Sequence, residues 1–243
     1  MNKLPFFSWK FSNEPINFLT TLIPSQDELH QLNSYTTLKA INEDSNKDIH
    51  QEYSLDHHQW DTDIQWISNL EQMELIIKKY NGYIIPDANN YHIGSGPWGK
   101  IMIIGDFPSI EKNVMESFTG DIKLLLTKML KYINVDIKDC YLTNLCYWIP
   151  HQQNLPSESL VPLMDMMIKH IQIINPQKIL LLGNVVAQIM LNNNQPFKNL
   201  RGHVYQLLDI PTVVSWHPKV LDKFKYFRKQ AAEDLELFKS IDN

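Results

Sequence analysis

The sequence predicts an α/β fold, a three-layer α/β/α arrangement around a mainly parallel sheet of about four strands. Two observations predict this class. Short, fully apolar runs such as residues 101–104 and 179–182 are typical of strands covered on both faces, as in parallel sheets. Segments with apolar residues at helical spacing alternate with these runs, which indicates crossover units of strand, helix and parallel strand.

The individual elements follow from the pattern in chain order. The first clear helix ends at Asn81-Gly82, and its apolar stripe comprises Leu70, Met73, Ile76, Ile77 and Tyr80. The expected strands cover residues 101–104, 140–145, 178–183, 204–208 and 212–216, and the further helices cover residues 122–133, 157–175, 185–191 and 225–240. Residues 106–120 and 148–156 are expected to be loops.

The chain divides into an N-terminal extension of unknown role, residues 1–65, and an α/β domain, residues 66–243. The extension is polar and poorly periodic, with one or two short helices expected within residues 19–42 and a loop at residues 50–63. His57 and His58 lie in that loop. Adjacent histidines cannot both face one site on a regular element, so we interpret them as surface residues and not as metal ligands.

Composition favours a soluble protein. Hydrophobic residues make up 44% of 243 residues, and no apolar run approaches the roughly 20 residues that a membrane span needs. The N-terminus lacks the apolar core of a secretion signal. We therefore expect a cytoplasmic bacterial protein that acts as a monomer and does not bind a membrane.

The chain has two cysteines, Cys140 and Cys146, which are too few for a four-thiolate metal or iron–sulfur site. Free cysteine is usually buried, so we interpret both as small apolar residues of the core. We expect no metal and no other cofactor.

Polar residues follow four of the expected strands: Asp106, Asn144, Gly183-Asn184 and His217. The carboxyl ends of parallel strands meet at one edge of a sheet, so these residues can converge there. A proline follows His217 and favours an extended conformation at the histidine. A carboxylate and an imidazole at two strand ends are the minimum equipment for acid–base or charge-stabilising chemistry.

A basic run follows His217 and comprises Lys219, Lys223, Lys225, Arg228 and Lys229. Two interpretations stay open: a solvated helix face, or a surface that contacts phosphates. Arg201 and Arg228 are the only arginines of the chain, so phosphate contacts must come mostly from lysines and backbone amides.

The ordered motifs resemble the uracil-DNA glycosylase superfamily, specifically its family 4 branch. The resemblance covers about residues 70–239. Its motifs are Ile103-Ile104-Gly105-Asp106-Phe107-Pro108, Phe118-Thr119-Gly120, Tyr141-Leu142-Thr143-Asn144-Leu145, Ile179-Leu180-Leu181-Leu182-Gly183, Leu200-Arg201-Gly202 and Trp216-His217-Pro218.

The resemblance implies an enzyme that flips uracil out of DNA and hydrolyses its bond to the sugar. It implies that His217 donates a hydrogen bond to the departing base anion and that Asp106 holds the attacking water. Phe118 would stack on the flipped base, and Asn144 would bind its polar edge. The remaining implied substrate contacts are Gly105, Phe107 and Pro108, and the loop after Pro218 would press into single- or double-stranded DNA. The predicted DNA contacts are Arg201, Pro218 and, from the basic run, Lys219 and Lys223.

This chain departs from the family pattern at several places. Asp106 stands where the family usually has Glu, and Ser109 stands where it has Gly. Many members bind an iron–sulfur cluster through four cysteines, and the third of these positions is Trp148 here. Two alternatives to uracil excision follow: a non-catalytic nucleic-acid-binding protein that keeps the fold, and an enzyme acting on another base or nucleoside.

Overall fold

The computed structural model describes residues 16–17, 57–86, 88, 90–150, 154–155 and 157–241. Its centre is a five-stranded sheet of order β5-β2-β7-β9-β8. The strands are β2 (Ile101–Gly105), β5 (Cys140–Asn144), β7 (Lys178–Leu182), β8 (Val204–Leu207) and β9 (Ile210–Ser215). Four strands are parallel, and β8 joins the edge antiparallel to β9. The predicted mainly parallel sheet is therefore confirmed, with an antiparallel edge strand as its fifth member.

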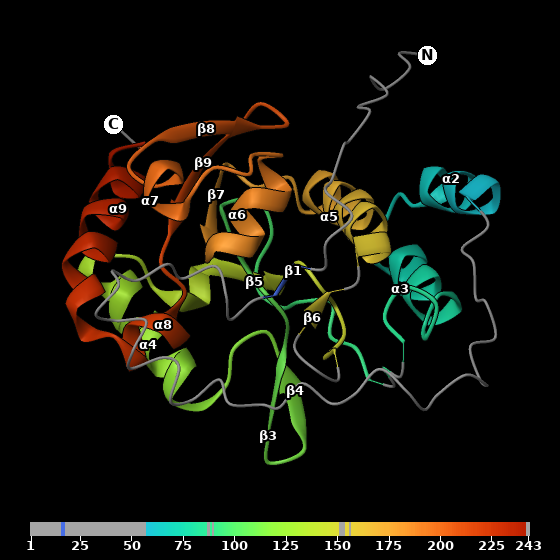
Figure 1. Ribbon diagram of the computed structural model, residues 1–243, viewed down its shortest axis with the longest axis horizontal. Coiled ribbons are helices and arrows are strands. Elements are labelled where there is room, and N and C mark those ends of the chain that lie inside the picture. Colours follow the sequence, from blue (N-terminus) through green and yellow to red (C-terminus); the bar gives the residue numbers. More distant parts are fainter. Residues whose placement is uncertain are drawn as a thin grey trace, which may run out of the picture.

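Helices cover both faces of this sheet (Figure 1). One face carries α4 (Gly120–Tyr132), α8 (Pro218–Lys223) and α9 (Arg228–Ser240). The other carries α5 (Leu160–Ile174) and α6 (Asn184–Met190), with α2 (His57–Trp66) and α3 (Leu70–Lys79) packed against α5. From β2 to β5 the chain moves across the sheet in one direction, and from β5 to β7 it moves in the opposite direction. Because both crossovers are right-handed, α4 and α5 lie on opposite faces. The three layers match the expected class.

Burial explains why the apolar runs form strands. Every residue of β2, β5 and β7 is buried, as expected for strands with helices on both sides. Cys140 and Cys146 are both buried, which confirms their interpretation as core residues. Short segments complete the chain: α7 (Phe197–Leu200) and the 3₁₀ turns η1 (Ile137–Asp139), η2 (Ser157–Ser159) and η3 (Lys225–Phe227).

The loop expected at residues 50–63 is wrong from residue 57 onward, because helix α2 begins at His57. Trp60 anchors this helix: its indole is buried and donates to Asp165 Oδ2 of α5 at 3.0 Å. The chain division at residue 65 stays a prediction, and the short helices expected within residues 19–42 lie outside the described residues.

Two further loop expectations are corrected. Residues 106–120 contain a hairpin of β3 (Ser109–Glu111) and β4 (Val114–Glu116). Its turn places Lys112 and Asn113 at φ 51° and 64°, so a Lys-Asn pair supplies the left-handed turn that glycine usually marks. Within residues 148–156, β6 (Asn154–Leu155) pairs with β1 (Ile16–Asn17).

The segment after Pro218 is helix α8 and not the expected loop. Proline suits the first position of a helix because its missing N–H has no partner to lose there, and the His217 side chain caps the same end. The proline therefore starts a helix immediately after the extended residue that it imposes.

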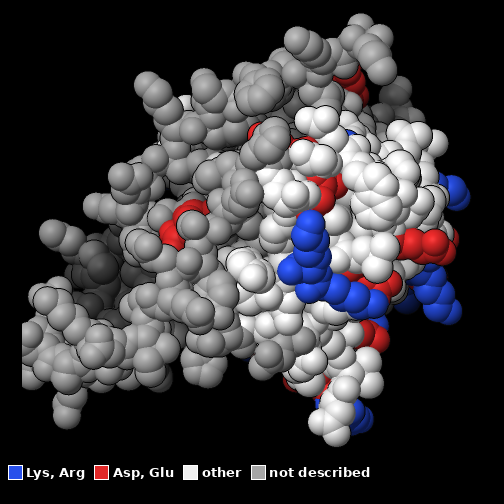
Figure 2. All heavy atoms as spheres, turned by 90° about the vertical axis from the view of Figure 1, so that its right-hand side faces the viewer, with Lys and Arg blue, Asp and Glu red and all other residues white. Residues whose placement is uncertain are grey.

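On the side formed by α2 and α3, basic and acidic side chains lie next to one another (Figure 2). The ion pairs Lys78–Glu74 and Lys79–Asp63 lie there. Among the described residues, no helix is both long and apolar enough to cross a membrane.

Candidate active site

The sheet register brings the predicted site residues to one edge. Gly105 and Asn144 are direct partners at the carboxyl ends of β2 and β5. Asp106 follows Gly105, and His217 follows the end of β9 by two residues. His217 Nε2 lies 3.4 Å from Asp106 Oδ1, so the two predicted catalytic groups meet.

The local fold fixes the tautomer of His217. Its Nδ1 accepts a hydrogen bond from Lys219 N at 3.1 Å, as the N-cap of α8. The proton of the neutral ring must then reside on Nε2. Burial lowers the pKa of His217 to about 4, so the ring is neutral at pH 7. Nε2 is buried and makes no hydrogen bond, despite its 3.4 Å distance to Asp106, so it is available as a donor.

Three hydrogen-bearing groups lie close to the Asp106 carboxylate: His217 Nε2, Phe107 N and Lys219 Nζ. Its Oδ1 accepts from Phe107 N at 2.8 Å, and Lys219 Nζ lies 3.3 Å and 3.4 Å from its two oxygens. Burial favours the neutral acid, but the positive charge that His217 gains when it is protonated at low pH, the charge of Lys219 and the Phe107 N–H outweigh it, so the pKa of Asp106 lies below its usual value. Asp106 is therefore an anion at neutral pH.

Asn144 is fully buried, and only one of its two polar side-chain atoms has a hydrogen-bond partner. Its Nδ2 donates to Ser117 O at 3.3 Å, whereas its Oδ1 has no hydrogen-bond partner. A buried amide oxygen without a partner is costly, which makes it a good acceptor for a polar ligand. Ser117 was not among the predicted residues; a backbone carbonyl carries no sequence signal.

Phe118 lies near His217 and the end of β2. Its ring is buried, and its centroid is 5.8 Å from that of His217 at an interplanar angle of 30°. A Cβ on Gly105 would lie 2.8 Å from both Phe118 Cζ and Asn144 Nδ2. Glycine at this position therefore lets the aromatic ring and the amide approach the end of β2.

The other predicted contacts differ in position. Phe107 and Pro108 are buried beside Asp106, and Pro218 is buried at the start of α8. Lys219 Nζ lies over the Phe107 ring, 4.4 Å from its centroid. The side chain of Lys219 thus turns toward β2. Sequence reasoning assigned Lys219 to DNA phosphates and missed its ion pair with Asp106, because only the start of α8 decides where this side chain points.

Arg201 does not join the site. Its Nε and Nη2 each donate to Asp234 at 2.8 Å, and its Nη1 donates to Gln230 Oε1 at 2.8 Å. The Arg201 side chain is 11% exposed and that of Asp234 is 1% exposed. This guanidinium holds α9 against the segment after α7, which favours a structural role, and its DNA contact stays a prediction.

The residues present do not fit a four-cysteine iron–sulfur cluster. Trp148, at the third cysteine position of the family pattern, is fully buried. The two cysteines of the chain, Cys140 and Cys146, direct their Sγ atoms to Asp136 O and Trp148 O. In the described part of the chain, no group of three or more His, Cys, Asp or Glu could hold a metal ion.

Comparison with known proteins agrees with this arrangement. The chain is 27% identical over 164 residues to the type-4 uracil-DNA glycosylase of Archaeoglobus fulgidus, covering 63% of this chain and 80% of that protein. It is 23% identical over 172 residues to the type-4 uracil-DNA glycosylase of Pyrobaculum aerophilum, covering 67% of this chain and 85% of that protein. Residues 94–236 match the family described as the uracil DNA glycosylase superfamily. The sheet, the site at its carboxyl edge and this match together place the chain in the uracil-DNA glycosylase superfamily.

Proposed function

We propose that this protein removes uracil from DNA by hydrolysing the N-glycosidic bond, as the first step of base excision repair. Membership in the superfamily supports a DNA glycosylase, and the two similar proteins are named as type-4 uracil-DNA glycosylases. The observation that carries the proposal is the meeting of Asp106 and His217 at 3.4 Å beside the unpaired Asn144 Oδ1.

The reaction breaks the bond between sugar C1′ and uracil N1, and the base leaves with the bonding electrons. Negative charge then develops on the base and positive charge on the sugar. In our proposal, His217 Nε2–H donates to the base anion, because Nδ1 is already an acceptor. The Asp106 anion stabilises the sugar cation and holds the water whose oxygen bonds to C1′; the carboxylate takes up the proton that this water releases.

Asn144 supplies selection for the base in this proposal. Its unpaired Oδ1 can accept the N3–H of uracil, and its Nδ2 can donate to the neighbouring carbonyl O4. Cytosine has no N3–H and presents an amino group instead of O4, so both contacts would be lost. Phe118 provides the ring on which the base stacks, and Gly105, Phe107 and Pro108 provide the surrounding surface.

We further propose that DNA lies along the start of α8, at Pro218, Lys219 and Lys223. Lys219 would then exchange its contact with Asp106 for a phosphate when DNA binds, freeing the carboxylate to hold water. We expect activity without any metal or iron–sulfur cluster, a prediction that the iron content and the visible spectrum of the active protein test.

The ion pair of Lys219 with Asp106 also favours a second candidate: a non-catalytic DNA-binding protein in which the ammonium permanently occupies the place of the water. The two functions differ in one measurement, the release of free uracil from a labelled oligonucleotide.

The test uses a single-stranded oligonucleotide with one radiolabelled uracil, under single-turnover conditions. We expect free uracil from the parent protein, none from a matched cytosine oligonucleotide, and a strongly reduced rate from His217→Ala with unchanged DNA affinity, since its contact strengthens only as charge develops. DNA binding without uracil release would instead support the non-catalytic function. An activity that requires added zinc would contradict the assigned role of His217.

A further inference from the structure

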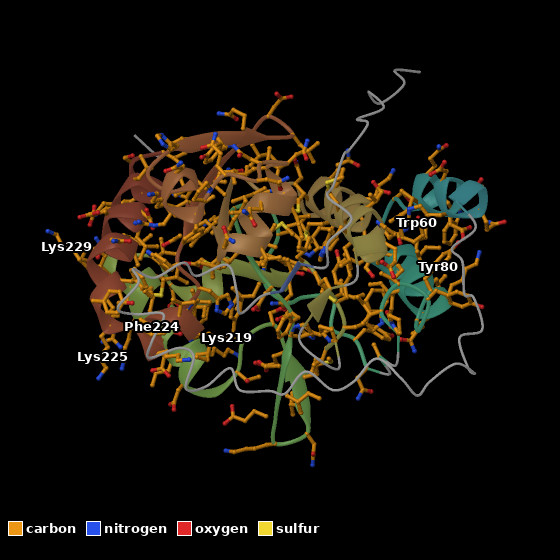
Figure 3. All side chains as sticks on the ribbon, viewed as in Figure 1. Trp60, Tyr80, Lys219, Phe224, Lys225 and Lys229 are labelled. Atoms are coloured by element: carbon orange, nitrogen blue, oxygen red, sulfur yellow. The ribbon has the colours of Figure 1, made fainter. Side chains whose placement is uncertain are left out.

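The surface that begins at α8 and runs through η3 into α9 is basic. Residues 219–229 contain Lys219, Lys223, Lys225, Arg228 and Lys229 against a single acidic residue, Asp222. Lys225 and Lys229 point away from the body of the molecule, and Phe224 lies between Lys225 and Lys219 (Figure 3). Lys225 and Lys229 are exposed in the structure.

Aromatic rings connect this surface to the site. The ring of Trp216, which precedes His217, stacks on Phe227 at 3.9 Å and 20°. Phe227 in turn contacts Tyr226 at 4.2 Å. Tyr226 is 56% exposed and lies between Lys225 and the start of α9. An exposed aromatic ring thus stands among lysines, in contact with Phe227, which stacks on Trp216 beside the proposed catalytic histidine.

Such a combination of cations and an exposed ring is what single-stranded nucleic acid requires. Phosphates pair with the cations, and unpaired bases stack on aromatic faces. A duplex hides the faces of its bases, so the ring would contribute little there. A duplex instead requires a side chain that wedges between its base pairs.

Helix α8 offers no apolar wedge of the kind that opens a base pair. Leu221 is 1% exposed, Val220 is partly buried and Lys219 turns toward Asp106. Extruding a paired base costs a few kcal/mol, which a wedge normally offsets, whereas a base in a single strand is already unpaired. The β3–β4 hairpin does expose Ile110 and Val114, but Lys112 is offset by the adjacent Glu111 and Glu116 pairs with Lys123, so the hairpin offers no excess positive charge to DNA phosphates.

We propose that the surface of Lys223, Lys225, Tyr226 and Lys229 binds single-stranded DNA next to the flipped nucleotide. A neighbouring base stacks on Tyr226, and the flanking phosphates pair with the three lysines. The claim that uracil is excised from this strand rests on the proposed function, whereas the claim that the surface binds single-stranded DNA does not. It makes single-stranded DNA the preferred substrate of the enzyme.

Binding is tested with a uracil-free, fluorescently labelled oligothymidine and with the corresponding duplex, by anisotropy at several salt concentrations. We expect the single strand to bind more tightly. Tyr226→Ala should weaken single-strand binding about tenfold, the order expected for one lost base stack, and Tyr226→Phe should bind like the parent. The matched control is Tyr132→Ala, since Tyr132 is 55% exposed on α4, and it should bind like the parent.

The lysines are tested by the salt dependence of single-strand binding. Lys225→Ala combined with Lys229→Ala should reduce the slope by about 1.4, or about 0.7 for each lost phosphate contact. The control Lys78→Ala removes a cation that pairs with Glu74 on α3 and should leave the slope unchanged. Equal affinity for duplex and single strand, or equal effects of Tyr226→Ala and Tyr132→Ala, would overturn the proposal. Because the probe contains no uracil, these outcomes are independent of whether the protein cleaves.

Discussion

Lys219 Nζ lies 3.3 Å from Asp106 Oδ1 and 3.4 Å from Asp106 Oδ2, so an ammonium approaches both oxygens of the proposed catalytic carboxylate. The same ammonium lies over the ring of Phe107. The Asp106 side chain is 16% exposed, and the Lys219 side chain is 38% exposed. The carboxylate that would hold water is therefore held by a cation from α8.

The first prediction concerns the pH dependence of Lys219→Met. Burial raises the pKa of Asp106, and protonated His217, the Lys219 ammonium and the Phe107 N–H bring it below its usual value. Removing the ammonium must raise this pKa, so that acidification protonates Asp106 at a higher pH. We expect kcat/KM of the variant, which reports the DNA-free protein in which Lys219 contacts Asp106, to fall on the acid side while the parent value is still level, because His217 stays neutral down to about pH 4.

The pH profile of kcat/KM for uracil release measures this effect. Lys219→Arg keeps a positive charge and should follow the parent, and Lys223→Met, one helical turn further along α8, should change affinity but not the profile. Superimposable acid limbs for Lys219→Met and the parent would show that the ammonium does not control Asp106.

The second prediction compares two changes at Asp106. Asp106→Asn keeps an oxygen that can accept from Phe107 N but removes the charge, so we expect most activity to be lost with little change in melting temperature. Asp106→Glu lengthens the side chain by one methylene and restores the usual family residue. A misplacement of about 1 Å can cost on the order of a hundredfold in rate, so we expect Asp106→Glu to retain or raise activity.

Melting temperature and single-turnover uracil release separate the catalytic role of Asp106 from a structural one. If Asp106→Asn melts at a lower temperature yet cleaves like the parent, the carboxylate serves only to bind the amide of its own loop, and the water is held elsewhere.

The third prediction concerns Gly105→Ala. The added Cβ would lie 2.8 Å from Phe118 Cζ and from Asn144 Nδ2, and one of them must shift. We expect a stability loss of about 1–3 kcal/mol from overpacking, and a loss of activity larger than this instability explains. Denaturant unfolding and uracil release per folded molecule measure both. The comparison is Gly99→Ala, where a Cβ meets open space, although φ is +88°. Equal activity of the two variants would contradict a tight fit around Gly105.

The fourth prediction concerns Arg201. Arg201→Met leaves Asp234 buried without its two hydrogen bonds, and breaking a buried pair costs about 3–5 kcal/mol. The salt dependence of DNA binding by the folded protein should not change. Adding Asp234→Leu should restore part of the stability, since it removes the unpaired carboxylate. A salt-dependence slope reduced by about one unit would instead restore the predicted phosphate contact.

Much of the fold follows from the sequence because it depends on local pattern. The apolar runs of β2 and β7 and the stripe of α3 are recognisable from the sequence pattern alone. A strand that is buried on both faces is apolar throughout, and a helix that is buried on one face repeats apolar residues at helical spacing. The meeting of Asp106, Asn144 and His217 also follows, because the carboxyl ends of parallel strands share one edge.

The tertiary structure alone decided how charged side chains are used. Lys219 and Arg201 look alike in sequence, as cations within the motifs that resemble the family, yet one turns inward to Asp106 and the other binds Asp234, 33 residues away. Such pairs depend on helix starts and long-range packing, which periodicity does not encode. A lysine or arginine side chain can reach several partners, and only the folded chain selects which carboxylate lies within hydrogen-bond distance.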